Sequence, residues 1–271
     1  TVRYNVDRVG LIADGKYYKM KKISQDKTFD YYEQTIHVGD APFGYYFEID
    51  AGRTTIFYTQ LGPQSELNQY YNFMVYPGFH TPEWMKGAVI YQIYVDRFCN
   101  GDPANDVLDN EYCYIDSPTR QVKDWYEYPA NMDVGRFYGG DLQGVKDKLD
   151  YLQDLGVDVI YFNPLFVSPS NHKYDIQDYD YIDPHFGKIV VDEGECLPDG
   201  VKENKRATKY ISRVTDKRNL EASNQFFADL VEEIHSRGMR VILDGVFNHC
   251  GSFNKWMDRE CIYENQEGYE K

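Results

Sequence analysis

Three polar residues follow an apolar run near the end of the sequence. In "VILDGVFNHCG", from Val241 to Gly251, the run stops at Asp244, and Asn248 and His249 come next. A carboxylate at the carboxyl end of a strand is typical of the active face of a (β/α)₈ barrel. A metal site and a buried, hydrogen-bonded histidine are the alternatives. No second His stands at a spacing typical of zinc, which weakens the metal alternative.

A second group of polar residues follows another apolar run. The segment "PSNHKYDIQDYDYIDPHFG", from Pro169 to Gly187, contains His172, Tyr174 and several aspartates. A single His in a loop is more often exposed to solvent than functional. Its clustering with Tyr and Asp after a strand makes a functional site as plausible as a surface loop.

A third group is rich in oxygen-bearing side chains. Asn100, Asp102, Asn105 and Asp106 lie within "NGDPAND", where Gly101 and Pro103 favour a tight turn. Calcium prefers six to eight oxygen ligands on a short curved loop, although the spacing is not that of an EF-hand. An Asx-rich turn without an ion is the alternative, because turns use the same residue types.

The segment "FYGGDL", from Phe137 to Leu142, could contribute to the same ion site. Gly139 and Gly140 permit a close approach of the backbone to an ion. Asp141 has a simpler interpretation, since an Asp before a helical pattern is a common N-cap.

Strands and helices that could position these groups alternate after residue 87. We predict strands at 88–98, 157–166 and 239–249, and helices at 142–156, ending at Gly156, and at 219–238. The run at 157–166 is apolar throughout, which is typical of a parallel strand buried on both faces. This order predicts an α/β fold. No G-x-G-x-x-G follows a strand, so a dinucleotide-binding fold loses ground and a (β/α)₈ barrel is favoured, with three of its strands countable.

The segment 167–218 is a long excursion after the second of these strands. Long loops in compact domains are usually functional. Within it, the charged and mixed stretch 190–210 is interpreted as a solvated insertion.

The first part of the chain has a different pattern. Residues 1–80 contain short segments rich in Tyr, Ile, Val and Thr, separated by turn signals such as Asp14-Gly15. This predicts an all-β sandwich. The segment 76–87, with two prolines and two glycines, is the natural linker. The expected domains are therefore 1–80 and 81–271, and the start of the sandwich could be truncated.

Composition excludes some classes of function. The net charge of −15 argues against nucleic acid as a partner. The sequence contains no run of 18 or more apolar residues, so no membrane span is predicted. Five cysteines without a C-x-x-C pair indicate reduced thiols of a cytoplasmic protein, with an extracellular location as the alternative. The 26 tyrosines fit strand propensity better than they fit sugar-stacking platforms, on composition alone.

Taken together, the motifs resemble the α-amylase superfamily, glycoside hydrolase family 13. "DGVFNH" resembles its D-x-V-x-N-H signature. "PEWMKGAVIYQIYVDRFCNGDPAND", "FYGGDLQGV" and "FNPLFVSPSNHKYD" resemble the neopullulanase, cyclomaltodextrinase and maltogenic amylase branch. The resemblance covers about Thr81 to Gly251 except for an insertion near 188–218. The N-terminal part resembles the starch-binding-type sandwich of that branch.

The resemblance implies a role for each group. Asn100, Asp102, Asn105, Asp106, Gly139 and Asp141 match a structural calcium site. Tyr174 matches the tyrosine that stacks under the sugar at the cleaved bond, and His249 a histidine that hydrogen-bonds its hydroxyls. Asp244 matches a carboxylate that orients a catalytic arginine, and His172 lies in the same substrate-binding loop.

The implied reaction is hydrolysis of α-1,4 or α-1,6 glucosidic bonds in maltodextrins, cyclodextrins or pullulan, with retention of configuration. A retaining enzyme needs a carboxylate nucleophile and a carboxylic acid/base. No residue here matches either, and the resemblance places both beyond Lys271, so the chain alone is expected to be inactive. A glucosyl transferase or isomerase of the superfamily, a carbohydrate-binding fragment and a homodimer formed through the sandwich are the alternatives.

Overall fold

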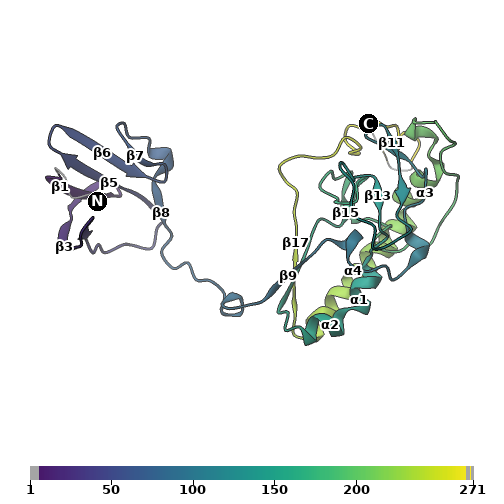
Figure 1. The fold of residues 1–271 in the computed structure, drawn as a ribbon, viewed down its shortest axis with the longest axis horizontal. Helices are drawn as coiled ribbons and strands as arrows, with labels where there is room; N and C mark the ends of the chain where they lie inside the picture. Colours follow the sequence, from purple (N-terminus) through teal and green to yellow (C-terminus); the bar gives the residue numbers. More distant parts are fainter. Residues whose placement is uncertain (1–5, 267–268, 270–271) are drawn as a thin grey trace. The chain divides into compact units, whose positions relative to one another are not determined.

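The computed structural model describes residues 6–266 and 269. The chain divides into two compact units, Thr1–Lys86 and Gly87–Lys271, each described by itself (Figure 1). The division lies inside the segment 76–87 that is rich in Pro and Gly. Within the described residues, no helix is both long and apolar enough to cross a membrane.

The described residues of the first unit form strands and two short 3₁₀ turns, η1 (Gln69–Tyr71) and η2 (Glu83–Met85). A six-stranded antiparallel sheet has the order β2-β1-β5-β6-β7, with β8 also paired to β5, and β3 and β4 form a separate hairpin. The strands are β1 (Arg8–Ala13), β2 (Lys16–Lys19), β3 (Lys21–Gln25), β4 (Asp30–Glu33), β5 (Phe43–Ala51), β6 (Thr54–Thr59), β7 (Gly62–Gln64) and β8 (Phe73–Val75).

Alternation of side chains explains the core face of this sheet. Val9 and Leu11 are buried on β1 and lie opposite Ile49 and Phe47 of β5. The predicted turn at Asp14-Gly15 joins β1 to β2, and both residues have positive φ, 48° and 70°. A two-residue hairpin turn of this type requires those angles, which Asp and Gly tolerate. The strand-rich N-terminal domain predicted from the sequence is confirmed.

The second unit is built on three parallel strands in the order β17-β14-β9. Helix α4 packs against β17 and against α1, and Figure 1 shows α1, α2 and α4 next to one another. The main elements are β9 (Ile90–Ile93), α1 (Leu142–Asp147), α2 (Leu149–Asp154), β14 (Val159–Phe162), α3 (Thr208–Thr215), α4 (Lys217–Ser236) and β17 (Arg240–Leu243). Three strands of a parallel barrel are present, as predicted, and the described residues do not close it.

The second unit also contains shorter strands and 3₁₀ turns. They are β10 (Cys113–Tyr114), β11 (Ser117–Pro118), β12 (Arg120–Gln121), β13 (Arg136–Phe137), β15 (Phe166–Val167) and β16 (Asp178–Ile182), with 3₁₀ turns η3 (Val95–Arg97), η4 (Pro103–Asn105) and η5 (Asn204–Arg206). Between the sheet and its helices lies an apolar core that includes Ile93, Leu149, Ile160 and Ile234.

Two predicted elements are shorter than expected. The helix expected at 142–156 is interrupted at Lys148, whose ψ of 7° is not helical, and Gly156 follows its second part with φ of 83°. The strand expected at 88–98 ends at Ile93. The chain then turns so that the buried Asp96 carboxylate accepts the N–H groups of Tyr138 and Gly139.

The interpretation of 190–210 as a solvated insertion is wrong for three of its apolar residues, although Val190 is exposed. Leu197, Ala207 and Tyr210 are buried in a second core that includes Tyr112 and Phe253. Charged residues of the same segment remain exposed. The segment therefore folds as a part of the second unit, and helix α3 places Tyr210 in this second core.

Candidate functional site

The end of β17 and the loop after β15 meet in one polar contact. The Tyr174 hydroxyl donates to Oδ2 of Asp244 at 2.8 Å. Asp244 is held in place by its own N–H, which donates to the carbonyl of Phe162 at the end of the neighbouring strand at 3.1 Å. The sheet thus presents the Asp244 carboxylate at the carboxyl ends of its strands, where barrel enzymes bind their substrates.

This contact keeps the Tyr174 hydroxyl protonated. Partial burial, the hydrogen bond to Asp244 and the charge of that carboxylate raise the pKa of Tyr174 to about 12. Partial burial and Asp244 also raise the pKa of Tyr161, which lies on β14. Asp244 therefore accepts a hydrogen bond from Tyr174 and also favours the neutral form of Tyr161.

His172 shapes the turn before Tyr174. Its Nδ1 accepts the N–H of Tyr174 at 3.1 Å and lies 3.1 Å from the Ser170 hydroxyl oxygen. Burial lowers the pKa of His172, so the neutral ring, with Nδ1 as an acceptor, is favoured. The rings of His172 and Tyr174 lie 6.0 Å apart at 34°. The two predicted residues are thus brought together.

His249 lies on an exposed part of the loop after β17. Its Nδ1 is 3.3 Å from Nδ2 of Asn248, and both side chains are exposed to solvent. The loop backbone is held by the Tyr179 hydroxyl, which lies 2.8 Å from the carbonyl oxygen of His249 and 2.9 Å from that of Val246. The His249 ring is therefore available to a ligand, and its ring contact is with Asn248 instead of Tyr174 or Asp244.

The six residues predicted to bind calcium separate into two groups. Asn100 donates from Nδ2 to Oδ1 of Asp106 at 2.8 Å, and a Cβ on Gly139 would lie 2.5 Å from each of those two atoms. The buried Oδ1 atoms of Asn100 and Asn105 accept no hydrogen bond from the described residues. Burial raises the pKa of Asp106 to about 6. Amide oxygens without donors and a partly buried carboxylate are a set that fits a hard cation.

Asp102 and Asp141 are otherwise engaged. Asp141 is the N-cap of α1 and accepts the N–H of Gly144 at 2.5 Å, and its Oδ2 accepts the N–H of Asp102 at 2.7 Å. Asp102 pairs through Oδ2 with Nζ of Lys188 at 2.8 Å. Across the described part of the chain, no three His, Cys, Asp or Glu side chains are arranged around a common metal position. A cation here would depend on amide and carbonyl oxygens.

A buried charge cluster was not foreseen from the sequence. Lys173 pairs with Asp183 at 2.6 Å, Asp183 and Glu111 flank His185 at 2.8 and 2.7 Å, and Arg213 pairs with Glu111 at 2.9 Å. All five side chains are at most 3% exposed. The cluster links the loop that carries Tyr174 to α3. Its members are up to 102 residues apart, so the spacing in the sequence carried no signal.

These charges stabilise one another. Although burial alone raises the pKa of a carboxyl group, Lys173 and His185 hold the pKa of Asp183 well below its usual range. Burial alone would lower the pKa of His185, but the Glu111 and Asp183 carboxylates raise it above the ordinary value. The cluster therefore favours a charged His185 between two carboxylates.

Tyr161 and Asp96 are further polar residues near the carboxyl ends of strands, of β14 and β9 respectively, and neither was predicted from the sequence. Both lie inside apolar runs of the sequence. Within such a run, the sequence does not distinguish a polar side chain at the carboxyl end of the strand from one that faces the core. Burial raises the pKa of Asp96 to about 7.

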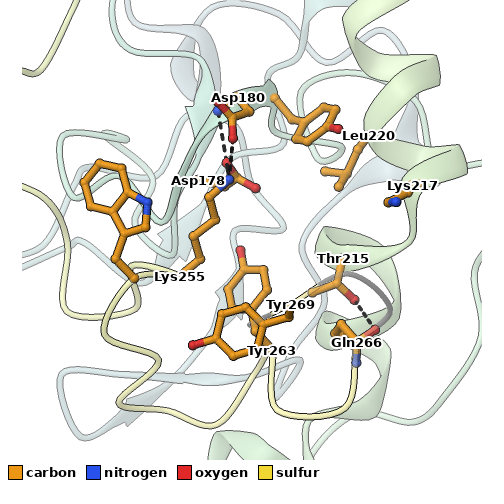
Figure 2. A pocket seen from close by; sticks show the side chains of 11 residues that line it. Asp178, Asp180, Thr215, Lys217, Leu220, Lys255, Tyr263, Gln266 and Tyr269 are labelled. Atoms are coloured by element: carbon orange, nitrogen blue, oxygen red, sulfur yellow. Dashed lines mark hydrogen bonds and ion pairs between the residues drawn. The ribbon is translucent and has the colours of Figure 1, made fainter. Parts of the chain in front are cut away.

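A separate hollow of about 470 Å³ lies between β16, the α3–α4 junction and the segment after residue 254. Figure 2 shows Lys255 bonded to Asp178 and Asp180 on one side of it and Thr215 bonded to Gln266 on the other. Its described lining includes none of the residues predicted from the sequence.

Two family profiles match the chain. The one described as "Alpha amylase, catalytic domain" matches residues 92–198 and 222–269, and "Alpha amylase, N-terminal ig-like domain" matches residues 1–80. The residues between the two catalytic segments include α3.

Curated relatives carry related names. A cyclomaltodextrinase of Thermoanaerobacter pseudethanolicus is 33% identical over 267 residues, which cover 93% of this chain and 38% of the relative. Neopullulanase 2 of Thermoactinomyces vulgaris is 35% identical over 85% of this chain and 32% of its own length. An intracellular maltogenic amylase of Bacillus subtilis is 34% identical over 88% and 34%. The chain thus spans about a third of the length of these relatives.

One solved structure is similar along most of the chain. The type III pullulan hydrolase from Thermococcus kodakarensis superposes with a TM-score of 0.50 at 28% identity, covering 95% of this chain and 39% of the hydrolase.

Proposed function

Because the chain belongs to the α-amylase family, we propose that it is part of an α-glucan hydrolase that cleaves α-1,4 or α-1,6 glucosidic bonds. The observation that carries this proposal is the Tyr174–Asp244 hydrogen bond at the carboxyl ends of the parallel strands. The names of the relatives support the substrate class, which comprises maltodextrins, cyclodextrins and pullulan.

In this proposal the chain forms one wall of a sugar-binding cleft. The Tyr174 ring packs under the glucosyl unit at the cleaved bond, since aromatic faces suit the C–H faces of sugars. His172 sets the turn beneath that ring, His249 hydrogen-bonds the hydroxyls of the sugar, and Asp244 orients a cationic side chain as well as the Tyr174 hydroxyl. Neutral polyhydroxylated ligands also tolerate the acidic surface of the chain, whose net charge is −15.

The proposed reaction proceeds with retention of configuration. It requires a nucleophilic carboxylate and an acid/base about 5–5.5 Å apart. We assign neither role to a residue of this chain, because no residue here matches the family's nucleophile or acid/base. The 271-residue chain should bind glucans without hydrolysing them.

Titration of the chain with maltoheptaose and β-cyclodextrin tests the proposal. Tyr174→Ala should raise the dissociation constant up to about tenfold, in proportion to the loss of a ring contact. Tyr128→Ala removes a tyrosine that is 90% exposed and should leave affinity unchanged. Failure of the unmodified chain to bind either sugar, or release of reducing sugar by it, would contradict the proposal. Comparing water with sugar as the acceptor in the complete enzyme would separate a hydrolase from a transferase.

We also propose a structural Ca²⁺ held by Asn100, Asn105, Asp106 and the backbone at Gly139, with Asp102 and Asp141 as neighbours that would have to exchange partners. When bound, the cation would supply positive charge that satisfies amide oxygens otherwise without donors. The support is the buried Oδ1 atoms of Asn100 and Asn105, and the glycine at position 139 that leaves room for the Asn100 amide group and the Asp106 carboxylate.

A cytoplasmic location is proposed for the whole protein. Its support is a relative named as intracellular. A homodimer formed through the N-terminal unit remains a prediction, and sedimentation of the purified chain at two concentrations would test it.

A further inference from the structure

Lys173 occupies an unusual position between two residues of the proposed sugar site. It directly follows His172 and precedes Tyr174, yet its own side chain is only 1% exposed. A buried lysine needs a partner for its charge, because desolvation of an unpaired ammonium is very costly. The side chain therefore points into the protein while its two neighbours contribute to the cleft wall.

The backbone of Lys173 has a conformation that lysine rarely adopts. Its φ is 60°, in the left-handed region that L-residues other than Gly, Asn and Asp enter infrequently. Such a conformation persists when the surroundings determine it. Reverting to negative φ would rotate the peptide planes on both sides, and with them the directions of His172 and Tyr174.

Every polar group of Lys173 is bonded to the turn or to the core beneath it. Its N–H donates to the Ser170 hydroxyl at 3.1 Å, and its carbonyl accepts the Ser168 hydroxyl at 3.2 Å. The ammonium donates to the Ser168 carbonyl at 2.8 Å and to Oδ2 of Asp183 at 2.6 Å. It also lies 4.8 Å from the centre of the Phe186 ring, a cation–π distance. Backbone hydrogen bonds, an ion pair and a ring contact therefore all fix the conformation of Lys173.

Asp183 is a firm anchor for that ammonium. Its N–H donates to the Leu165 carbonyl at 2.9 Å, and its Oδ2 also accepts the N–H of Ser168 at 3.1 Å. Its Oδ1 accepts from both the N–H and the ring of His185. The carboxylate is thus fixed on the chain that follows β16, independently of the turn that carries Tyr174.

We propose that Lys173 is a positioning residue of the sugar site: its buried ammonium, held by Asp183, maintains the left-handed turn that aims the Tyr174 hydroxyl at Asp244. The inference rests on the proposed function in taking Tyr174 as the sugar-facing ring. Loss of the ammonium releases the turn and separates Tyr174 from Asp244, although Lys173 itself touches neither the sugar nor Asp244.

The test measures the Tyr174–Asp244 contact without a sugar. In the 271-residue chain labelled with ¹³Cζ-tyrosine, the Tyr174 resonance is assigned by its loss in Tyr174→Phe. Asp244→Asn should shift that resonance, since the hydroxyl loses a charged acceptor. In a Lys173→Met background the same Asp244→Asn change should leave the resonance unmoved. A shift of undiminished size in Lys173→Met would overturn the proposal.

Two further variants separate positioning from general loosening. Arg213→Met removes another buried cation of the same charge cluster, at its far end on α3. Measured well below its own lowered Tm, where the unit is folded, it should preserve the Asp244→Asn shift. An equal loss of the shift in folded Arg213→Met would overturn the proposal. If Lys173→Met does not fold, Lys173→Met with Asp183→Asn replaces it, because removing both charges leaves no unpaired buried ion.

Sugar binding gives the second readout. Lys173→Met should raise the dissociation constant for maltoheptaose up to about tenfold, and Tyr174→Ala should add nothing further in that background. Full additivity of the two losses would count against an action through Tyr174. If the unmodified chain binds no sugar while Lys173→Met still abolishes the resonance shift, the proposed function fails and the positioning role of Lys173 stands.

Discussion

Arg213 provides the most direct test of whether the segment containing α3 is an integral part of the fold. Its side chain is 2% exposed and donates to Oε2 of Glu111 and to the carbonyl of Asp106, both at 2.9 Å. It also bonds to both carboxylate oxygens of Asp192 at 2.7 and 3.1 Å. We predict that Arg213→Met strongly destabilises the second unit.

The magnitude follows from what the substitution leaves behind. Glu111 is fully buried and, among the described residues, would keep only His185 as a charged partner. Breaking a buried ion pair on one side costs about 3–5 kcal/mol. For a unit of this length, 1 kcal/mol corresponds to about 2–4 °C in Tm, so the expected decrease is about 6–20 °C.

The matched control is Arg218→Met. Arg218 lies in the first turn of α4 and pairs with Asp216 at 2.6 Å, but its side chain is 67% exposed. Exposed pairs contribute about 0–1 kcal/mol, so the control should lower Tm by less than about 4 °C. Differential scanning calorimetry of both variants gives the comparison. A decrease for Arg213→Met no larger than that of the control would refute the view that α3 is needed by the core.

Three further predictions concern pH, backbone space and calcium. Because the pKa of His185 is raised, its stabilising contribution is complete below about pH 6.5 and is lost as pH rises through that raised pKa. The Tm of the unmodified chain should therefore fall as pH rises above about 6.5. His185→Gln, although less stable, should show a flatter profile, and parallel profiles would contradict this. A Cβ at Gly140 would lie 2.0 Å from a backbone carbonyl oxygen, so Gly140→Ala should lower the free energy of unfolding by about 3 kcal/mol or more. A Cβ at Gly135 would meet open space, so in Gly135→Ala the free energy of unfolding should stay within about 1 kcal/mol of the unmodified chain. Urea denaturation measures both. Removal of Ca²⁺ by EDTA should lower Tm by about 5 °C or more, reversibly, and the Asn100→Leu/Asn105→Leu double variant should not respond; an equal response in both would rule out this site.

Local patterns in the sequence were sufficient for elements whose residues are neighbours in the chain. Asp14-Gly15 forms the hairpin turn, Asp141 caps α1, and Gly156 takes a left-handed conformation after α2. Each depends on the preference of one or two residues for a backbone conformation or a free N–H, which the sequence states directly.

Predictions were less accurate where a pattern had two interpretations. The apolar spacing of 142–156 fits one helix, but the structure breaks it at Lys148. The charged stretch 190–210 looked solvated because charged residues outnumber its apolar ones. Tyr210 nevertheless enters a core, since a few large side chains suffice to bury a segment when a complementary surface exists.

The sequence by itself determined the family and the two fold classes. It also determined that Asp244 and His249 follow the carboxyl end of a strand. These follow from periodicity, motif order and strand ends, which are properties of contiguous residues. Only the tertiary structure decided that Tyr174 meets Asp244 across 70 residues and that Lys173 turns inward to Asp183. Such contacts depend on how strands and loops are placed in space, and a buried charge is tolerated only where that placement supplies its partner.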